Sequence, residues 1–193
     1  MKNSPGKKIK TAVFISGKGS NLKSLINFSK KKISNIEIVL VITNNKKAKG
    51  LQFAIKNKIN NFYINYKIKK ISEKKILKKL AELKIKLICL AGFMKILSGD
   101  LIKRFNGKIM NIHPSLLPKY KGLNTFSRML KNRESKAGCT VHYVNNKLDN
   151  GKTIVQKSFF INSKDNLYTM KKKTQKLEYR AFPEAIIKIF SYI

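Results

Sequence analysis

The strongest constraint on the fold is an alternation in the first half of the chain between short apolar runs and segments with helical spacing. We predict strands over residues 11–15, 36–42, 62–66 and 86–91, with helices around Leu22 to Ile26, over 50–58 and around Ile76 to Leu83. Strands that are apolar on both faces are buried between two layers of helices, which is typical of a parallel sheet. Because the connections between such strands are right-handed, this half is predicted to be Rossmann-like.

The second half of the chain has a different pattern. An apolar run over 108–112 leads into Pro114, which lacks an N–H group and ends strand pairing. We predict a short helix over 126–130, then strands over 139–144 and 153–161 joined as an antiparallel hairpin by the turn at 148–151. A long final helix begins near Asn166, and Pro183 predicts a break or kink in it.

These patterns predict one α/β domain with a mostly parallel central sheet flanked by helices, a C-terminal antiparallel hairpin and a long final helix. The length of 193 residues and the 42% hydrophobic content suit one packed core. No internal repeat or linker divides the chain. We therefore expect a basic N-terminal extension over 1–8 and a single domain over 9–193.

The formal net charge of +34 allows two interpretations. It is the footprint of a nucleic-acid-binding module, or it is compositional drift toward lysine that solvates the surface and attracts anionic substrates in general. Proteins that recognise nucleic acids favour arginine for bidentate contacts, whereas arginine occurs here at only four positions, Arg104, Arg128, Arg133 and Arg180. We therefore expect no specific nucleic-acid partner.

The chain carries no apolar run long enough to cross a membrane and no signal-peptide pattern at its start. Cys89 and Cys139 lie within apolar runs, which indicates buried, reduced thiols and a cytoplasmic protein. Two cysteines and two histidines far apart in sequence make a structural zinc site improbable. We expect neither a membrane partner nor a metal.

The stretch around His113 is the best candidate for catalytic chemistry. Asn111 and His113 lie two residues apart at the end of a predicted strand, so their side chains share one face. An amide donor beside an imidazole can stabilise an oxyanion and move a proton. Taken alone, a structural histidine at a strand end is the alternative. His142 lies on another predicted strand and is interpreted as a hydrogen-bonded strand histidine.

A glycine-rich loop over 17–21 follows the first strand and opens a helix, where backbone N–H groups favour an anion. A dinucleotide site would need a third glycine where Leu22 stands, and an acidic residue near Asn44. A phosphate monoester therefore fits the loop better than NAD or ATP. A plain tight turn is the alternative reading of the loop alone.

Five motifs that occur in order along the chain resemble the phosphoribosylglycinamide formyltransferases: SGKGSNL over 16–22, LAGFMKILS over 90–98, NIHPSLLPKY over 111–120, GCTVH over 138–142 and LDNG over 148–151. The third motif is shared more widely, by formyltransferases that act on methionyl-tRNA and on amino sugars. The first two point to the glycinamide ribonucleotide branch. The resemblance covers nearly the whole chain and implies a Rossmann-like formyltransferase fold, with a monomer or a homodimer as the assembly.

The resemblance implies transfer of a formyl group from the cosubstrate 10-formyltetrahydrofolate to the amine of 5′-phosphoribosylglycinamide, in purine (IMP) biosynthesis and without a metal. It assigns catalysis to Asn111, His113 and Asp149, with Asp149 pairing with His113 and raising its pKa. It implies that the phosphate and ribose of the substrate are bound by Gly19, Ser20, Asn21, Gln175 and Glu178. It implies that the folate is bound by Phe93, Met94, Lys95, Ile96, Leu97, Val144, Asn145 and Leu148.

The chain departs from the family's usual residues at Lys95, Asn124, Phe126 and Asn150, and none of these belongs to the catalytic set. Two other functions stay open at this point. One is a related enzyme that formylates an amino sugar or another amine. The other is an RNA-binding module that uses the basic surface.

Overall fold

The computed structural model describes residues 8–190. The contacts of the chain group it into two compact units, residues 1–110 and 111–193, and each is described by itself. Residues 1–7 of the predicted extension lie outside the described range. The prediction of a single domain over 9–193 stays a prediction.

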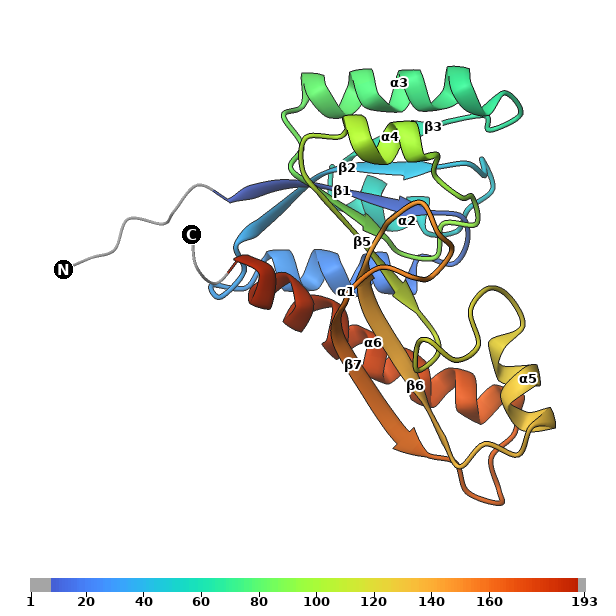
Figure 1. Cartoon of the computed structure of the whole chain (residues 1–193). Helices are drawn as coiled ribbons and strands as arrows, with labels where there is room; N and C mark the ends of the chain where they lie inside the picture. The colour runs from blue at the N-terminus through green and yellow to red at the C-terminus, as the bar shows by residue number, and fades with distance from the viewer. Residues whose placement is uncertain (1–7, 191–193) are drawn as a thin grey trace. The chain divides into compact units, whose positions relative to one another are not determined.

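The first unit alternates strands and helices in the predicted way. Its elements are β1 (Ile9–Ile15), α1 (Ser20–Ser29), β2 (Ile36–Thr43), α2 (Leu51–Lys56), β3 (Asn60–Tyr63), α3 (Lys69–Glu82), β4 (Leu87–Leu90) and α4 (Gly99–Arg104). β1 pairs in parallel with β2 and with β4, and β2 pairs in parallel with β3. Helices α3 and α4 lie on one side of these strands and α1 lies on the other (Figure 1). The central strand β1 is fully buried from Ala12 to Ile15, as expected for a strand covered on both faces.

The second unit contains the hairpin and the long helix. Its elements are α5 (Thr125–Lys131), β6 (Lys136–Tyr143), β7 (Thr153–Phe160) and α6 (Leu167–Phe190), and β5 (Lys108–His113) runs through the division between the units. β6 and β7 pair antiparallel, with Val141 opposite Val155. α6 packs along both strands and buries Phe182, Ile186 and Phe190 (Figure 1).

All seven strands belong to one sheet with the order β3-β2-β1-β4-β5-β6-β7. The predicted fold class, α/β with a mostly parallel sheet, an antiparallel C-terminal pair and a long final helix, is confirmed. Within residues 8–190 no helix is both long and apolar enough to span a membrane.

Three local predictions need correction. β3 ends at Tyr63 instead of residue 66, because the chain turns at Asn65, whose side chain accepts a hydrogen bond from the Lys67 N–H. The short helix α4 was not predicted; Ser98 caps it by accepting the Leu101 N–H at 3.1 Å. α6 continues through Pro183, so the predicted break is absent; buried side chains on both sides of the proline hold the helix against the sheet, and the kink stays a prediction.

Candidate active site

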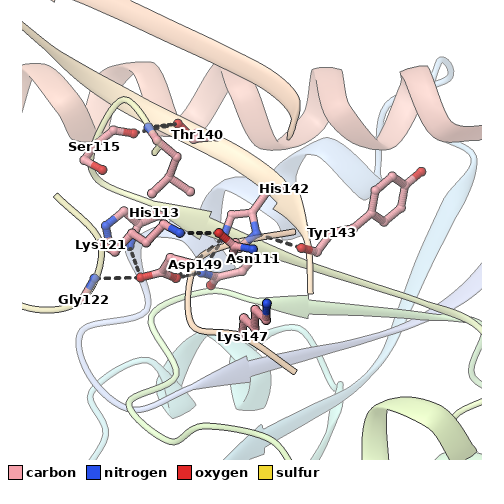
Figure 2. A network of polar contacts seen from close by, with 12 residues as sticks. Asn111, His113, Ser115, Lys121, Gly122, Thr140, His142, Tyr143, Lys147 and Asp149 are labelled. Carbon is pink, nitrogen blue, oxygen red and sulfur yellow. Dashed lines mark hydrogen bonds and ion pairs between the residues drawn. The ribbon is translucent and has the colours of Figure 1, made fainter. Parts of the chain in front are cut away.

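The ends of β5 and β6 and the loop after β6 bring four polar side chains together in the second unit. Asn111 and His113 extend from one face of β5, His142 comes from β6, and Asp149 comes from the β6–β7 loop. His113, His142 and Asp149 are all buried. Figure 2 shows the Asp149 carboxylate lying between the two histidine rings.

The predicted pairing of His113 with Asp149 is present. His113 Nδ1 lies 3.3 Å from Asp149 Oδ2. The other ring nitrogen, Nε2, lies 2.8 Å from the backbone carbonyl of Tyr120, which can only accept, so Nε2 carries a proton. Each nitrogen of the His113 ring therefore faces an acceptor, and a second proton on the ring would complete both hydrogen bonds.

Asn111 contacts both His142 and Asp149. Its amide Nδ2 lies 3.2 Å from His142 Nε2 and donates to Asp149 Oδ1 at 3.4 Å. His142 Nδ1 donates to the carbonyl of Tyr143 at 2.8 Å, so Nε2 of a neutral His142 ring accepts from Asn111. The expected hydrogen-bonded strand histidine is confirmed, but its partners are Asn111 and Asp149, which the sequence did not reveal.

The direction of the His113 pKa shift differs from the expectation. Burial lowers the pKa of His113 below its ordinary value, and the Tyr120 carbonyl and the Asp149 charge, which both raise it, do not offset burial. Positive charge at His142 and Arg128 lowers it further. Asp149 therefore raises the pKa of His113, as expected, but the expectation of a net rise was wrong, because burial outweighs this effect. At pH 7 the ring is mainly neutral and able to accept a proton.

The Asp149 carboxyl stays ionised. Burial opposes its charge, but the hydrogen bond from the Gly122 N–H and the neighbouring His142 and His113 rings together outweigh burial and lower the pKa of Asp149. The Gly122 N–H donates to Oδ2 at 2.9 Å. Asp149 itself has a positive φ of 45°, which an L-residue rarely adopts. This backbone geometry turns the carboxylate toward the histidines.

The glycine-rich loop of the first unit is held by close backbone packing. Gly19 has a φ of 73° and precedes α1, which begins at Ser20. A Cβ atom on Gly50 would lie 2.8 Å from the Gly19 Cα and 2.8 Å from Ile15 Cδ1, and the Gly50 N–H donates to the Gly17 carbonyl at 2.9 Å. Two glycines are therefore required where the loop meets the start of α2, whatever the loop binds.

The segment after β4, residues 93–97, is anchored at both ends. The Met94 N–H donates to Ser16 Oγ at 2.7 Å, and the ring of Phe93 packs edge-on against Phe14. At the other end the buried Glu73 carboxylate accepts the Ser98 N–H at 2.8 Å. The side chains of Met94 and Ile96 are exposed at 65% and 61%, so an anchored backbone presents apolar groups that suit a ring.

The other predicted substrate residues are divided between the two units. Gln175 and Glu178 lie three residues apart on α6 and are half-buried, so they share one face of that helix. Val144, Asn145 and Leu148 lie in the β6–β7 loop, where Leu148 is exposed. Ser20 and Asn21 begin α1 in the first unit, and Lys95 and Leu97 lie in the segment after β4.

Three of the four departures from the family's pattern lie in the second unit. Asn124 is left-handed and precedes α5, and Phe126 packs against the small core of Met129, Ala137 and Met170. Asn150 accepts a hydrogen bond from Lys121 Nζ. None of these changes the contacts among Asn111, His113 and Asp149.

The described residues 8–190 contain no group of three or more His, Cys, Asp or Glu side chains placed to hold a metal ion. Cys89 and Cys139 are free and buried, as predicted. Burial raises the pKa of Cys89, and it raises that of Cys139 to about 12. Neither thiol is therefore activated as a nucleophile.

The geometry agrees with the comparison of the chain with known proteins. The model of the formyl transferase family matches residues 9–186. The chain belongs to the formyl transferase family. It is 42% identical over 182 residues to the trifunctional purine biosynthetic protein adenosine-3 of Gallus gallus, and 39% identical over 183 residues to that of Homo sapiens. These matches cover 93% of this chain but only 18% of each relative.

Solved formyl transferase structures of similar length share the fold. The phosphoribosylglycinamide formyltransferase from Brucella melitensis is 36% identical with a TM-score of 0.90, and the match covers 97% of both chains. The one from Coxiella burnetii, in complex with CHES, is 37% identical with a TM-score of 0.88, over 93% of this chain and 86% of that one. Within the formyl transferase family, the chain therefore groups with the phosphoribosylglycinamide formyltransferases.

Proposed function

We propose that the chain transfers a formyl group from 10-formyltetrahydrofolate to the amine of 5′-phosphoribosylglycinamide, a step of purine (IMP) biosynthesis. The observation that carries this proposal is the cluster of Asn111, His113 and Asp149, in which buried His113 Nδ1 lies 3.3 Å from the buried Asp149 carboxylate. The named activity of the similar solved structures supports it.

The reaction needs a stabilised oxyanion and a place for a proton. Attack of an amine on a formyl carbon puts negative charge on the formyl oxygen and leaves an extra proton on the amine nitrogen. His113 is neutral at pH 7 and can take that proton, which gives the ring the second N–H that its two acceptors favour. Asp149 then stabilises the imidazolium and fixes its orientation. Collapse of the tetrahedral intermediate breaks the bond between the formyl carbon and N10 of the folate, and the imidazolium returns its proton to N10, which leaves as the amine of tetrahydrofolate.

Asn111 is proposed as the neutral donor to the oxyanion. In the structure its amide donates toward His142 and Asp149 at 3.2 and 3.4 Å, both long for hydrogen bonds. Such loose contacts are readily exchanged for a shorter bond to a charged oxygen. An oxyanion donor in a site from which water is excluded contributes about 3–4 kcal/mol to lowering the barrier.

The substrate groups are assigned by residue. We propose that Gly19, Ser20 and Asn21 bind the phosphate through backbone N–H groups at the start of α1, helped by the helix dipole. Gln175 and Glu178 are proposed to contact phosphate and ribose. The folate is assigned to residues 93–97 together with Val144, Asn145 and Leu148. The proposed steps use only these side chains and backbone groups and need no metal.

The setting of the activity is also proposed. Two buried free thiols suit the cytoplasm, where reducing conditions keep cysteines unpaired. We propose that the chain acts as a monomer or a homodimer on small molecules, and that its lysine-rich surface has no specific nucleic-acid partner.

A turnover assay with glycinamide ribonucleotide and 10-formyltetrahydrofolate tests the function. We expect Asn111→Ala and His113→Ala to lower kcat by about 100-fold or more, because each removes a group that acts in the transition state. Lys108→Ala, at the exposed start of the same strand, is the control and should keep wild-type turnover. Turnover of an amino sugar but not of glycinamide ribonucleotide would assign the chain to the related amine formyltransferases instead.

A further inference from the structure

The turn from Tyr120 to Gly122 contacts both members of the His113–Asp149 pair through its backbone. The Tyr120 carbonyl lies 2.8 Å from His113 Nε2, and the Gly122 N–H donates to Asp149 Oδ2 at 2.9 Å. Figure 2 shows Gly122 beside Asp149, with His113 close by. Since these are backbone groups, their positions depend on the conformation of the turn and not on the identity of the side chains that point into the site.

The conformation of this turn is one that an isolated chain disfavours. Tyr120 has a φ of 57° and Gly122 a φ of 77°. The left-handed region is comfortable for glycine, but it crowds the Cβ of a tyrosine. A non-glycine residue stays in this region only where several contacts with its surroundings hold it there.

The surroundings that hold Tyr120 come from α5 and the residues just after it. The Tyr120 hydroxyl donates to Glu134 Oε1 at 2.8 Å and accepts from Asn132 Nδ2 at 3.0 Å. The guanidinium of Arg128 lies 5.2 Å from the centre of the Tyr120 ring, and Arg128 Nη1 donates to the Lys121 carbonyl at 2.7 Å. We call Tyr120, Arg128, Asn132 and Glu134 the clamp.

Two clamp residues, Glu134 and Tyr120, have further contacts outside the clamp. Lys119 Nζ lies 3.1 Å from Glu134 Oε1, and hydrogen bonds from Tyr120 and Lys119 lower the pKa of Glu134, which is therefore ionised. The Tyr120 ring packs against the buried core that contains Met129 and Met170. The tyrosine is thus held by an ionised acceptor at its hydroxyl, by a cation on its ring and by apolar contacts along its edge.

We propose that Tyr120, Arg128 and Glu134 are positioning residues for the catalytic pair: by holding the turn, they fix the Tyr120 carbonyl on His113 and the Gly122 N–H on Asp149. For its effect on turnover this inference rests on the proposed formyl transfer. Its effect on the His113 ring does not depend on any substrate. Apart from the charge of Arg128, which lowers the pKa of His113, the clamp side chains act on the catalytic pair through the turn, so their part in the chemistry is indirect.

The charged and polar groups that face the His113 ring define the expected spectroscopic signature. They are Asp149 and the Tyr120 carbonyl, which raise its pKa, and His142 and Arg128, which lower it. Loosening the turn without changing any charge weakens the Tyr120 contact, so the pKa of His113 should fall further. Removing the Arg128 charge should instead raise the pKa of His113.

Tyr120→Phe is the principal test, because it deletes the hydroxyl and keeps the ring under Arg128. We expect kcat to fall about 10-fold, since small errors in orientation are costly to proton transfer, with KM for both substrates within 2-fold of wild type. The His113 resonances in an NMR titration should shift to a lower midpoint. Tyr168→Phe is the matched control, because Tyr168 is an exposed tyrosine of α6 with Lys172 over its ring.

Arg128→Lys is the second variant and covers the case in which Tyr120→Phe fails to fold. It keeps the charge but loses the planar stacking and the aligned donor to the Lys121 carbonyl, so it should reproduce the loss of kcat. Folded variants of both kinds with kcat within 2-fold of wild type and an unchanged His113 titration would overturn the proposal. If wild-type protein shows no formyl transfer, the proposed function fails, and the titration still decides the role of the clamp.

Discussion

The packing of Gly19 against Gly50 gives a sharp prediction, because the same loop contains its own control. Gly19 has a φ of 73°, and any Cβ on it would overlap the backbone of Gly50. A Cβ on Gly17, two residues earlier, would meet no atom within 4 Å. Gly19→Ala and Gly17→Ala therefore add the same methyl group to the same loop with very different consequences.

The cost of Gly19→Ala has two parts. An L-residue in the left-handed region costs about 1–2 kcal/mol relative to glycine. Forcing backbone apart in a closely packed contact adds about 1–3 kcal/mol. We expect the free energy of unfolding to fall by about 3 kcal/mol, which for a chain of this size lowers Tm by roughly 6–12 °C. Gly17→Ala should stay within about 0.5 kcal/mol of wild type.

Urea unfolding followed by circular dichroism measures both variants. Turnover assays below the transition then separate folding from binding: Gly19→Val should raise the KM for glycinamide ribonucleotide far more than the KM for folate. A Gly19→Ala protein as stable as Gly17→Ala would refute the packing argument. Equal effects of Gly19→Val on the two KM values would show that the loop is structural and binds no phosphate.

Two further predictions concern buried ionisable groups. Because the pKa of His113 is lowered on folding, the unfolded chain binds the extra proton, and stability should fall as pH drops below about 6.5; His113→Gln should remove this part of the slope in urea unfolding at pH 5–7. The pKa of Asp149 is also lowered, so its contribution is lost only below about pH 4. Glu73→Gln weakens the acceptor for Ser98 and should destabilise the protein by about 2 kcal/mol and raise the KM for folate, whereas exposed Glu82→Gln should do neither.

Most of the fold was predictable because burial on both faces leaves a direct trace in the sequence. The apolar runs over 11–15, 36–42 and 86–91 match the buried strands β1, β2 and β4. The missed helix α4 has six residues, too few for a periodic pattern, and its start depends on the Ser98 cap. The predicted break at Pro183 is absent because tertiary packing outweighs the local penalty of a proline inside a helix.

The candidate site was likewise predictable from the sequence only in part. Asn111 and His113 were predictable as a pair because alternation along a strand fixes which side chains share a face. The contacts of His142 were not, since they depend on the loop that returns Asp149 to β6. No pattern in the sequence indicated that the Tyr120 carbonyl would face the imidazole.

The lowered pKa of His113 shows why the chemistry of such a site cannot be predicted without the three-dimensional structure. From sequence the ionised partner Asp149 dominates, and it favours the imidazolium. In the structure the ring is buried, and burial outweighs the partner. A neutral imidazole facing two acceptors is the form that can take a proton, and the second hydrogen bond that it then gains offsets part of the cost of charging a buried ring. This balance depends on burial and on the clamped turn together.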